Sequence, residues 1–198
     1  MAAKLKQQVV GTHIRRLRKG RRMSLRALAG ETDFSPSFIS QVENGQVSPS
    51  ISSMEKIAGA LGVTMGEFFA AAAEGEGGQV VRAAGRAAIG SGWSSAEIEA
   101  LSPMKASQKL EPVLITLAPG GRSGKHPYPH PREEFAFVLE GEVELTLGPE
   151  RHVLAGGDAA MILPKELRLW ENSSAQAARV LIVSIRGRTA DAATTQAS

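Results

Sequence analysis

The segment Met23-Ser-Leu-Arg-Ala-Leu-Ala29 is followed, after four residues, by Phe34-Ser-Pro-Ser-Phe-Ile-Ser-Gln-Val-Glu-Asn-Gly45, and this pair decides the fold of the N-terminal third. Ser24 can cap one short helix, because a serine oxygen at a helix start accepts a hydrogen bond from a free backbone amide. Ser35-Pro36 can open a second helix in the same way, and Asn44-Gly45 can close it. The pair therefore predicts two short helices joined by a tight turn.

Helical periodicity continues on both sides of this pair. Apolar residues recur at helical spacing over residues 10–17 before it and over residues 51–61 after it. Ser50 can open the later helix, and Thr64 with Glu67 three positions on forms a capping-box pattern for one more short helix. The sequence thus predicts an all-α bundle of five helices.

The pattern changes after this bundle. Residues 70–78 are alanines, glycines and glutamates, which suit a linker. From residue 79 onward, short apolar or alternating runs are separated by glycine and proline, as in an antiparallel β-barrel. We therefore predict an α+β multidomain chain: a helical domain over 1–70, a linker and lead-in strand over 71–95, a β-barrel over 96–187, and a disordered tail over 188–198.

Charge is distributed unevenly along the chain. Residues 1–70 hold ten Lys/Arg and five Asp/Glu, and nine of the basic residues lie within the first 26 positions. This asymmetry favours a polyanionic partner, although a solvated basic helix face would have the same composition.

The chain has no cysteine, which excludes disulfides and thiolate metal sites. It shows no apolar run long enough for a membrane helix and no signal peptide, so we expect a cytoplasmic protein without a membrane partner.

A pair of helices joined by a tight turn can place the start of its second helix in the major groove of DNA. Gln41 can offer paired groups to adenine, Ser37 can contact a base or a phosphate, and Phe38 can meet a thymine methyl. Arginines and the amides at the two helix starts can hold phosphates. Solvated surface is the alternative for each side chain. The candidate DNA-binding residues are Arg18, Ser24, Arg26, Ser35, Ser37, Phe38, Ser40, Gln41 and Asn44.

Together with Ser48-Pro-Ser50 and Ile57-Ala-Gly-Ala-Leu-Gly-Val63, the opening segments closely resemble the phage-repressor-like (xenobiotic-response-element type) helix-turn-helix regulators over about residues 8–70. The resemblance implies binding of double-stranded operator DNA as a homodimer. Leu25 departs from the pattern, because many members carry there a glutamine that touches DNA.

The stretch Gly121-Arg-Ser-Gly-Lys-His-Pro-Tyr-Pro-His-Pro-Arg-Glu-Glu-Phe-Ala-Phe-Val-Leu-Glu-Gly141 resembles the first motif of the cupins, a jelly-roll family with a metal site in the barrel mouth. His130 and Glu134 match two of the four ligand positions. Tyr128 replaces the first histidine, and Arg168, or Leu169 in another register, replaces the last one. His130 and Glu134, with His126 swinging in, would hold a divalent metal such as zinc only marginally, so we expect polar lining and no resident metal.

Arg168 suggests a different ligand. A guanidinium can grip the carboxylate of an amino acid or another organic acid, with Tyr128, His130 and Glu134 completing an effector site. The alternative is a surface arginine on an edge strand.

A helix-turn-helix domain followed by one cupin domain resembles a known arrangement of transcription regulators, in which the cupin is taken to bind a small-molecule effector. We therefore expect a DNA-binding regulator, not an enzyme, in which the effector shifts the placement of the DNA-binding heads. The alternatives are a metal-dependent cupin enzyme, such as a dioxygenase or isomerase, that carries a DNA-binding domain, and a helical bundle that binds protein.

Overall fold

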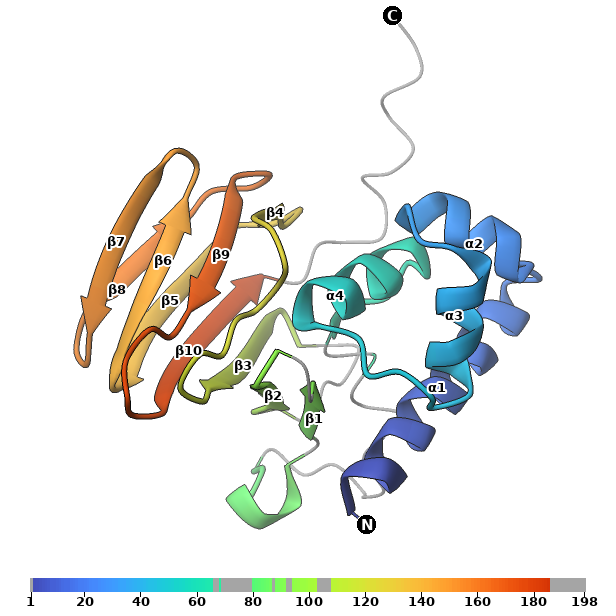
Figure 1. Cartoon of the computed structure of the whole chain (residues 1–198), viewed down its shortest axis with the longest axis horizontal. Helices are drawn as coiled ribbons and strands as arrows, with labels where there is room; N and C mark the ends of the chain where they lie inside the picture. Colours follow the sequence, from blue (N-terminus) through green and yellow to red (C-terminus); the bar gives the residue numbers. More distant parts are fainter. Residues whose placement is uncertain are drawn as a thin grey trace, which may run out of the picture.

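A computed structural model of the chain describes residues 2–65, 68, 80–86, 88–91, 94–102 and 108–185, and it has the predicted α+β class. Helices come first along the chain and strands follow, and the two groups form separate bodies (Figure 1). The predicted linker over 70–78 and the predicted tail over 188–198 lie outside the described residues. The helices are α1 (Ala2–Gly20), α2 (Leu25–Thr32), α3 (Pro36–Glu43) and α4 (Ile51–Ala60), with a short 3₁₀ turn η1 (Ala83–Gly85) before the strands.

Three serines start helices as predicted. The hydroxyl oxygens of Ser24, Ser35 and Ser50 cap α2, α3 and α4 and accept hydrogen bonds from the amide three residues later, at 3.0 to 3.1 Å. The apolar stripe of each helix faces one common core, which includes Ile14, Leu28, Ile39, Met54 and Ile57. Local capping and periodicity therefore account for this part of the fold.

The predicted bundle of five helices is not supported. Four α-helices stand in the described part of the chain, and of the segment predicted for the fifth helix only Thr64, Met65 and Phe68 are described. Met65 and Phe68 have helical conformation, and Phe68 is buried with its ring 5.3 Å from the ring of His13. Phe68 thus packs against α1 and belongs to the core.

Two antiparallel sheets form the C-terminal part. The six-stranded sheet has the order β1-β2-β3-β10-β5-β8, and the four-stranded sheet has the order β4-β9-β6-β7. The strands are β1 (Ala88–Ser91), β2 (Ala96–Ala100), β3 (Leu110–Leu117), β4 (Tyr128–Pro129), β5 (Glu134–Glu140), β6 (Glu142–Leu147), β7 (Glu150–Ala155), β8 (Ala159–Ile162), β9 (Leu167–Glu171) and β10 (Ala178–Ile185).

The arrangement is an open sandwich of jelly-roll type, so the predicted antiparallel fold is found but closure into a barrel is not supported. In the described residues the sheets remain two separate ladders, and an isolated bridge pairs Arg122 with Glu171 of β9 in the four-stranded sheet. Alternating apolar residues specify which face of a strand is buried, but they do not specify which strand edges pair. Gly141 makes the tight turn between β5 and β6 with a φ of 79°, and a Cβ there would lie 2.8 Å from the Ala177 carbonyl oxygen.

One end of the sandwich contacts α4. In Figure 1, α4 lies on the side of the helical group that faces β3 and β4. The amide of Ser52 donates to the Ser123 carbonyl at 3.1 Å, and the hydroxyl of Ser48 donates to the Gly90 carbonyl at 2.9 Å. A Cβ at Gly124 would lie 2.7 Å from the Ser52 hydroxyl oxygen, so the two bodies meet closely here. Among the described helices, none has the length and apolar character to cross a membrane.

Candidate functional site

The first candidate site is the helix-turn-helix surface made by α2 and α3. Asp33 adopts a left-handed conformation (φ 55°) at the end of α2, which turns the chain sharply toward the Ser35 cap of α3. Ile39 and Val42 are buried on the inner side of α3. The opposite side of α3 is therefore presented to solvent.

Three predicted DNA-binding residues form one stripe on that side. Ser37, Gln41 and Asn44 are exposed, and their spacing of four and three residues places them on one face at and just beyond α3. Arg26 on α2 is exposed as well, close in sequence to the amides that α2 presents at its start. All four side chains are exposed, and the three of the stripe lie on one face of the helix.

The other predicted contacts have internal partners. The hydroxyl oxygens of Ser24 and Ser35 are used as caps. Phe38 is half-buried, with its ring 4.8 Å from the ring of Phe34, and the hydroxyl of Ser40 lies 3.4 Å from the Asn44 side-chain amide. These four residues therefore hold the surface in shape, whether or not they also contact DNA.

Arg18 has a structural role in addition to the phosphate contact predicted for it. Its Nε and Nη2 donate to the two carboxylate oxygens of Glu43 at 2.6 and 2.8 Å, and its Nη1 donates to the Met23 carbonyl at 2.9 Å. Both charged side chains are buried, and the hydrogen bond to Glu43 raises the pKa of Arg18. All three guanidinium nitrogens are engaged, so we exclude Arg18 from the proposed phosphate contacts. Glu43 lies next to Val42 on the buried side of α3, and an acidic residue at a buried helix position is the sequence feature that could have indicated this ion pair.

The second candidate site lies inside the sandwich at the end that faces α4. Tyr128 on β4 pairs with Arg168 on β9, and the guanidinium carbon lies 4.7 Å from the centre of the tyrosine ring. Glu134 starts β5 in the opposite sheet with its side chain buried. The structure therefore brings the predicted effector residues together, from three strands and, for His130, from the loop after β4.

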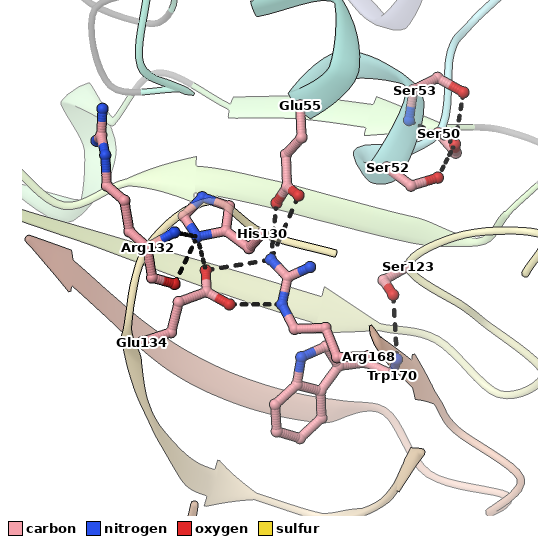
Figure 2. Close-up of polar contacts among 10 residues, drawn as sticks. All are labelled: Ser50, Ser52, Ser53, Glu55, Ser123, His130, Arg132, Glu134, Arg168 and Trp170. Carbon is pink, nitrogen blue, oxygen red and sulfur yellow. Dashed lines mark hydrogen bonds and ion pairs between the residues drawn. The ribbon is translucent and has the colours of Figure 1, made fainter. Parts of the chain in front are cut away.

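Arg168 is the centre of this polar cluster, which consists of Glu55, Tyr128, His130, Glu134 and Arg168 (Figure 2). Nε and Nη2 of Arg168 donate to the two oxygens of Glu134, the Nη2 bond at 3.1 Å. Burial opposes the charge of Arg168, but Glu55, Tyr128 and Glu134 outweigh burial and raise its pKa. Arg168 is thus a permanent buried cation, and the alternative of a surface arginine on an edge strand is wrong.

Glu55 is the member of the cluster that the sequence analysis missed. It belongs to α4, and both of its carboxylate oxygens lie 3.3 Å from Nη2 of Arg168. The side chains of Glu55 and Arg168 are 14% and 1% exposed. Because 113 residues separate the two, no local pattern could indicate the contact.

The rest of the cluster is ordered by further polar contacts. Nδ1 of His130 lies 3.2 Å from the Arg132 carbonyl oxygen and 3.5 Å from Glu134. Arg132 also reaches the buried carboxylate of Glu111 at 3.3 Å. Burial, and after it the charge of Glu55, raise the pKa of Tyr128, so its phenol stays neutral.

The residues at this site do not fit a metal ion. Both oxygens of Glu134 accept hydrogen bonds from the Arg168 guanidinium. The carboxylate is therefore already paired with a cation and is not available as a metal ligand. His126 is exposed, and among the described residues no group of three or more His, Cys, Asp or Glu is arranged to hold a metal. Arg168 supplies the positive charge of the site instead.

Comparison with known proteins bears on both sites. A helix-turn-helix family model matches residues 14–68, and a cupin domain model matches residues 113–184. The HTH-type transcriptional regulator PuuR of Escherichia coli (strain K12) is 27% identical over 171 residues, which cover 86% of this chain and 91% of that protein. PuuR of Shigella flexneri matches to the same extent. The crystal structure of an HTH_3 family transcriptional regulator from Vibrio cholerae superposes with a TM-score of 0.73 at 23% identity, covering 94% of this chain and 99% of that one, which shows a shared fold.

Proposed function

We propose that this chain, a helix-turn-helix transcription regulator with a C-terminal cupin domain, reads double-stranded operator DNA through α3 and senses a small molecule at its polar cluster. The observation that carries the DNA-binding part is the exposed stripe of Ser37, Gln41 and Asn44 along α3, which is capped and buries its opposite side in the core. Such a stripe leaves hydrogen-bonding groups at the surface of a helix that its own domain holds rigid. DNA lies in the cytoplasm of a bacterial-type cell, so we assign the protein to that compartment.

Selection of bound duplexes from a random pool by the intact chain tests this assignment. A recovered palindrome would support a dimer on two half-sites and would give their spacing. In the recovered duplex, Gln41→Ala should relax specificity at one base pair per half-site and weaken binding by about tenfold, since a paired side-chain contact discriminates by about 1–3 kcal/mol. Gln46→Ala, an exposed glutamine outside α3, is the control.

Arg26→Ala should act differently from Gln41→Ala. Loss of a phosphate contact should weaken all duplexes about equally and lower the slope of log affinity against log salt by about 1. No enrichment of any sequence, together with no binding at low salt, would reject the regulator assignment.

We propose that the effector site is the polar cluster, with amino acids and other organic acids as the candidate ligands. The buried guanidinium of Arg168 suits a carboxylate, and Tyr128 and His130 lie beside it to complete recognition. The engagement of Glu134 by Arg168 argues against the alternative of a metal-dependent dioxygenase or isomerase. Two measurements distinguish the effector site from the metal-dependent enzyme. One is metal analysis of the purified protein, in which stoichiometric metal would favour the enzyme. The other is titration calorimetry with acids, amines, sugars and nucleosides.

We propose that the protein is a homodimer joined through the outer face of the six-stranded sheet. That face exposes apolar side chains: Phe135 is paired with Met161, and Leu110 is paired with Ile185. Phe135 and Met161 are 40% and 52% exposed, and a second copy of the same face would cover them.

Sedimentation of Phe135→Glu tests the dimer, because a charge among these exposed apolar side chains should lower the measured molecular mass from that of a dimer to that of a monomer. Val153→Glu is the control, since Val153 is 65% exposed on the other sheet. A wild-type protein that sediments as a monomer at micromolar concentration would refute this interface.

A further inference from the structure

The three nitrogens of the Arg168 guanidinium do not have equal numbers of hydrogen-bond acceptors. Glu134 takes the edge formed by Nε and Nη2 with both of its oxygens. Glu55 places both oxygens on Nη2 alone, at 3.3 Å. Nη1 is buried, and in the described part of the chain it has no hydrogen-bond partner. The edge formed by Nη1 and Nη2 is therefore only half occupied.

A buried guanidinium N–H without an acceptor is costly, and a carboxylate across Nη1 and Nη2 would satisfy it with two parallel hydrogen bonds. Nε1 of Trp170, two residues from Arg168 on β9, is a second buried donor without a partner in the described residues. Figure 2 shows the indole beside the arginine and Glu55 reaching the guanidinium from the helix above. Two unpaired buried donors favour a ligand rich in acceptor oxygens.

We infer that Glu55 is a tethered carboxylate that occupies part of the effector site and that an effector carboxylate displaces it from Arg168, which releases α4 from the cupin domain. The inference rests on the proposed effector role of the polar cluster and adds how the site is coupled to the DNA-binding domain. Nη2 has two N–H groups, and Glu134 and Glu55 each accept from it, so a carboxylate that spans Nη1 and Nη2 needs the N–H that Glu55 uses. Binding of the effector and docking of α4 are therefore mutually exclusive at this edge.

Because α4 contacts both the sandwich and the helical core, displacing Glu55 from Arg168 affects the DNA-binding helices. The first turn of α4 is fixed to the sandwich by the Ser52–Ser123 hydrogen bond, and Glu55 continues this contact one turn later. The body of α4 packs in the same core as α2 and α3, through Met54, Ile57 and Ile39. A change in how α4 docks therefore moves the α2–α3 pair relative to the cupin domain, and by linkage DNA binding changes effector affinity by the same factor.

Titration calorimetry of the intact chain with acetate, succinate, glutarate and L-glutamate tests the inference. Glu55→Gln keeps the shape of the side chain and removes its charge, so at least one of these acids should bind it about tenfold more tightly than it binds the wild type. Glu31→Gln is the matched control, because Glu31 is an exposed carboxylate of the same domain, and it should leave the affinity unchanged. Arg168→Gln combined with Glu134→Gln, which removes both members of the most deeply buried ion pair together, should lose acid binding while keeping a cooperative thermal transition.

Three results would overturn the inference. The first is equal affinity of Glu55→Gln and wild type for every acid that binds. The second is acid binding that survives in the Arg168/Glu134 double variant. The third is no acid binding even by Glu55→Gln. The duplex selection described above is independent of these titrations, so a chain that selects DNA but fails them keeps its assignment as a regulator. Equal affinities of Glu55→Gln and wild type reject the displacement of Glu55 alone, whereas no acid binding by either also rejects organic acids as the effectors.

Discussion

The buried pair of Arg18 and Glu43 is expected to be a main support of the DNA-binding surface, and Glu43→Ala tests this. Their side chains are 9% and 1% exposed and share two hydrogen bonds of 2.6 and 2.8 Å. Removing one partner leaves a buried charge without compensation, which typically costs about 3–5 kcal/mol. For a chain of 198 residues such a loss lowers the melting temperature by roughly 10 °C.

Differential scanning calorimetry of the intact chain measures this change. Glu31→Ala removes an exposed carboxylate from the same domain and should shift the melting temperature by less than 2 °C, an estimate based on the small effect of surface substitutions. The double variant Arg18→Met with Glu43→Leu should recover most of the loss, because an apolar pair needs no compensation. If Glu43→Ala melts within about 2 °C of wild type, or the double variant is as unstable as the single one, the pair does not support the surface as we argue.

Three further outcomes are expected from the helical domain and its contact with the sandwich. Gly11→Ala should destabilise by about 1–3 kcal/mol in chemical denaturation, because its Cβ would lie 2.4 and 2.5 Å from two backbone oxygens at the end of α3. Gly30→Ala, with open space around it in α2, should be neutral or stabilising. Burial, aided by a neighbouring guanidinium, lowers the pKa of His13 below its ordinary value of 6.5, so the unfolded chain binds the proton first. Stability measured by melting should therefore fall as pH drops below 6.5, and His13→Gln should flatten that fall. Gly124→Ala would press on Ser52 and should raise hydrogen exchange in the first turn of α4, whereas unchanged exchange would show that this contact is loose.

Local chemistry explains which parts of the fold could be predicted from the sequence. The caps at Ser24, Ser35 and Ser50 depend on residues three positions apart, so a window of sequence contains both partners. The closure of a barrel depends on edges far apart along the chain, and the alternating pattern of β10, which is the same for an open or a closed sheet, could not reveal it.

The same limit applies to the two sites. Tyr128, His130, Glu134 and Arg168 were found because a family pattern places them in register, and the structure brings all four together. Glu55 has no such pattern. Its role follows only from the docking of α4 on the sandwich, which is a property of the whole fold.

The imperfect geometry of the Glu55 contact is what makes it suitable as a switch. Charge-assisted hydrogen bonds between nitrogen and a carboxylate are usually about 2.7–2.9 Å long, whereas both Glu55 contacts are 3.3 Å and fall on one nitrogen. A tether with two ideal bonds would leave an incoming carboxylate no advantage, because both would make the same contacts. A tether that leaves Nη1 unsatisfied gives the effector one additional bond to a buried charge, and that difference alone sets the direction of the switch.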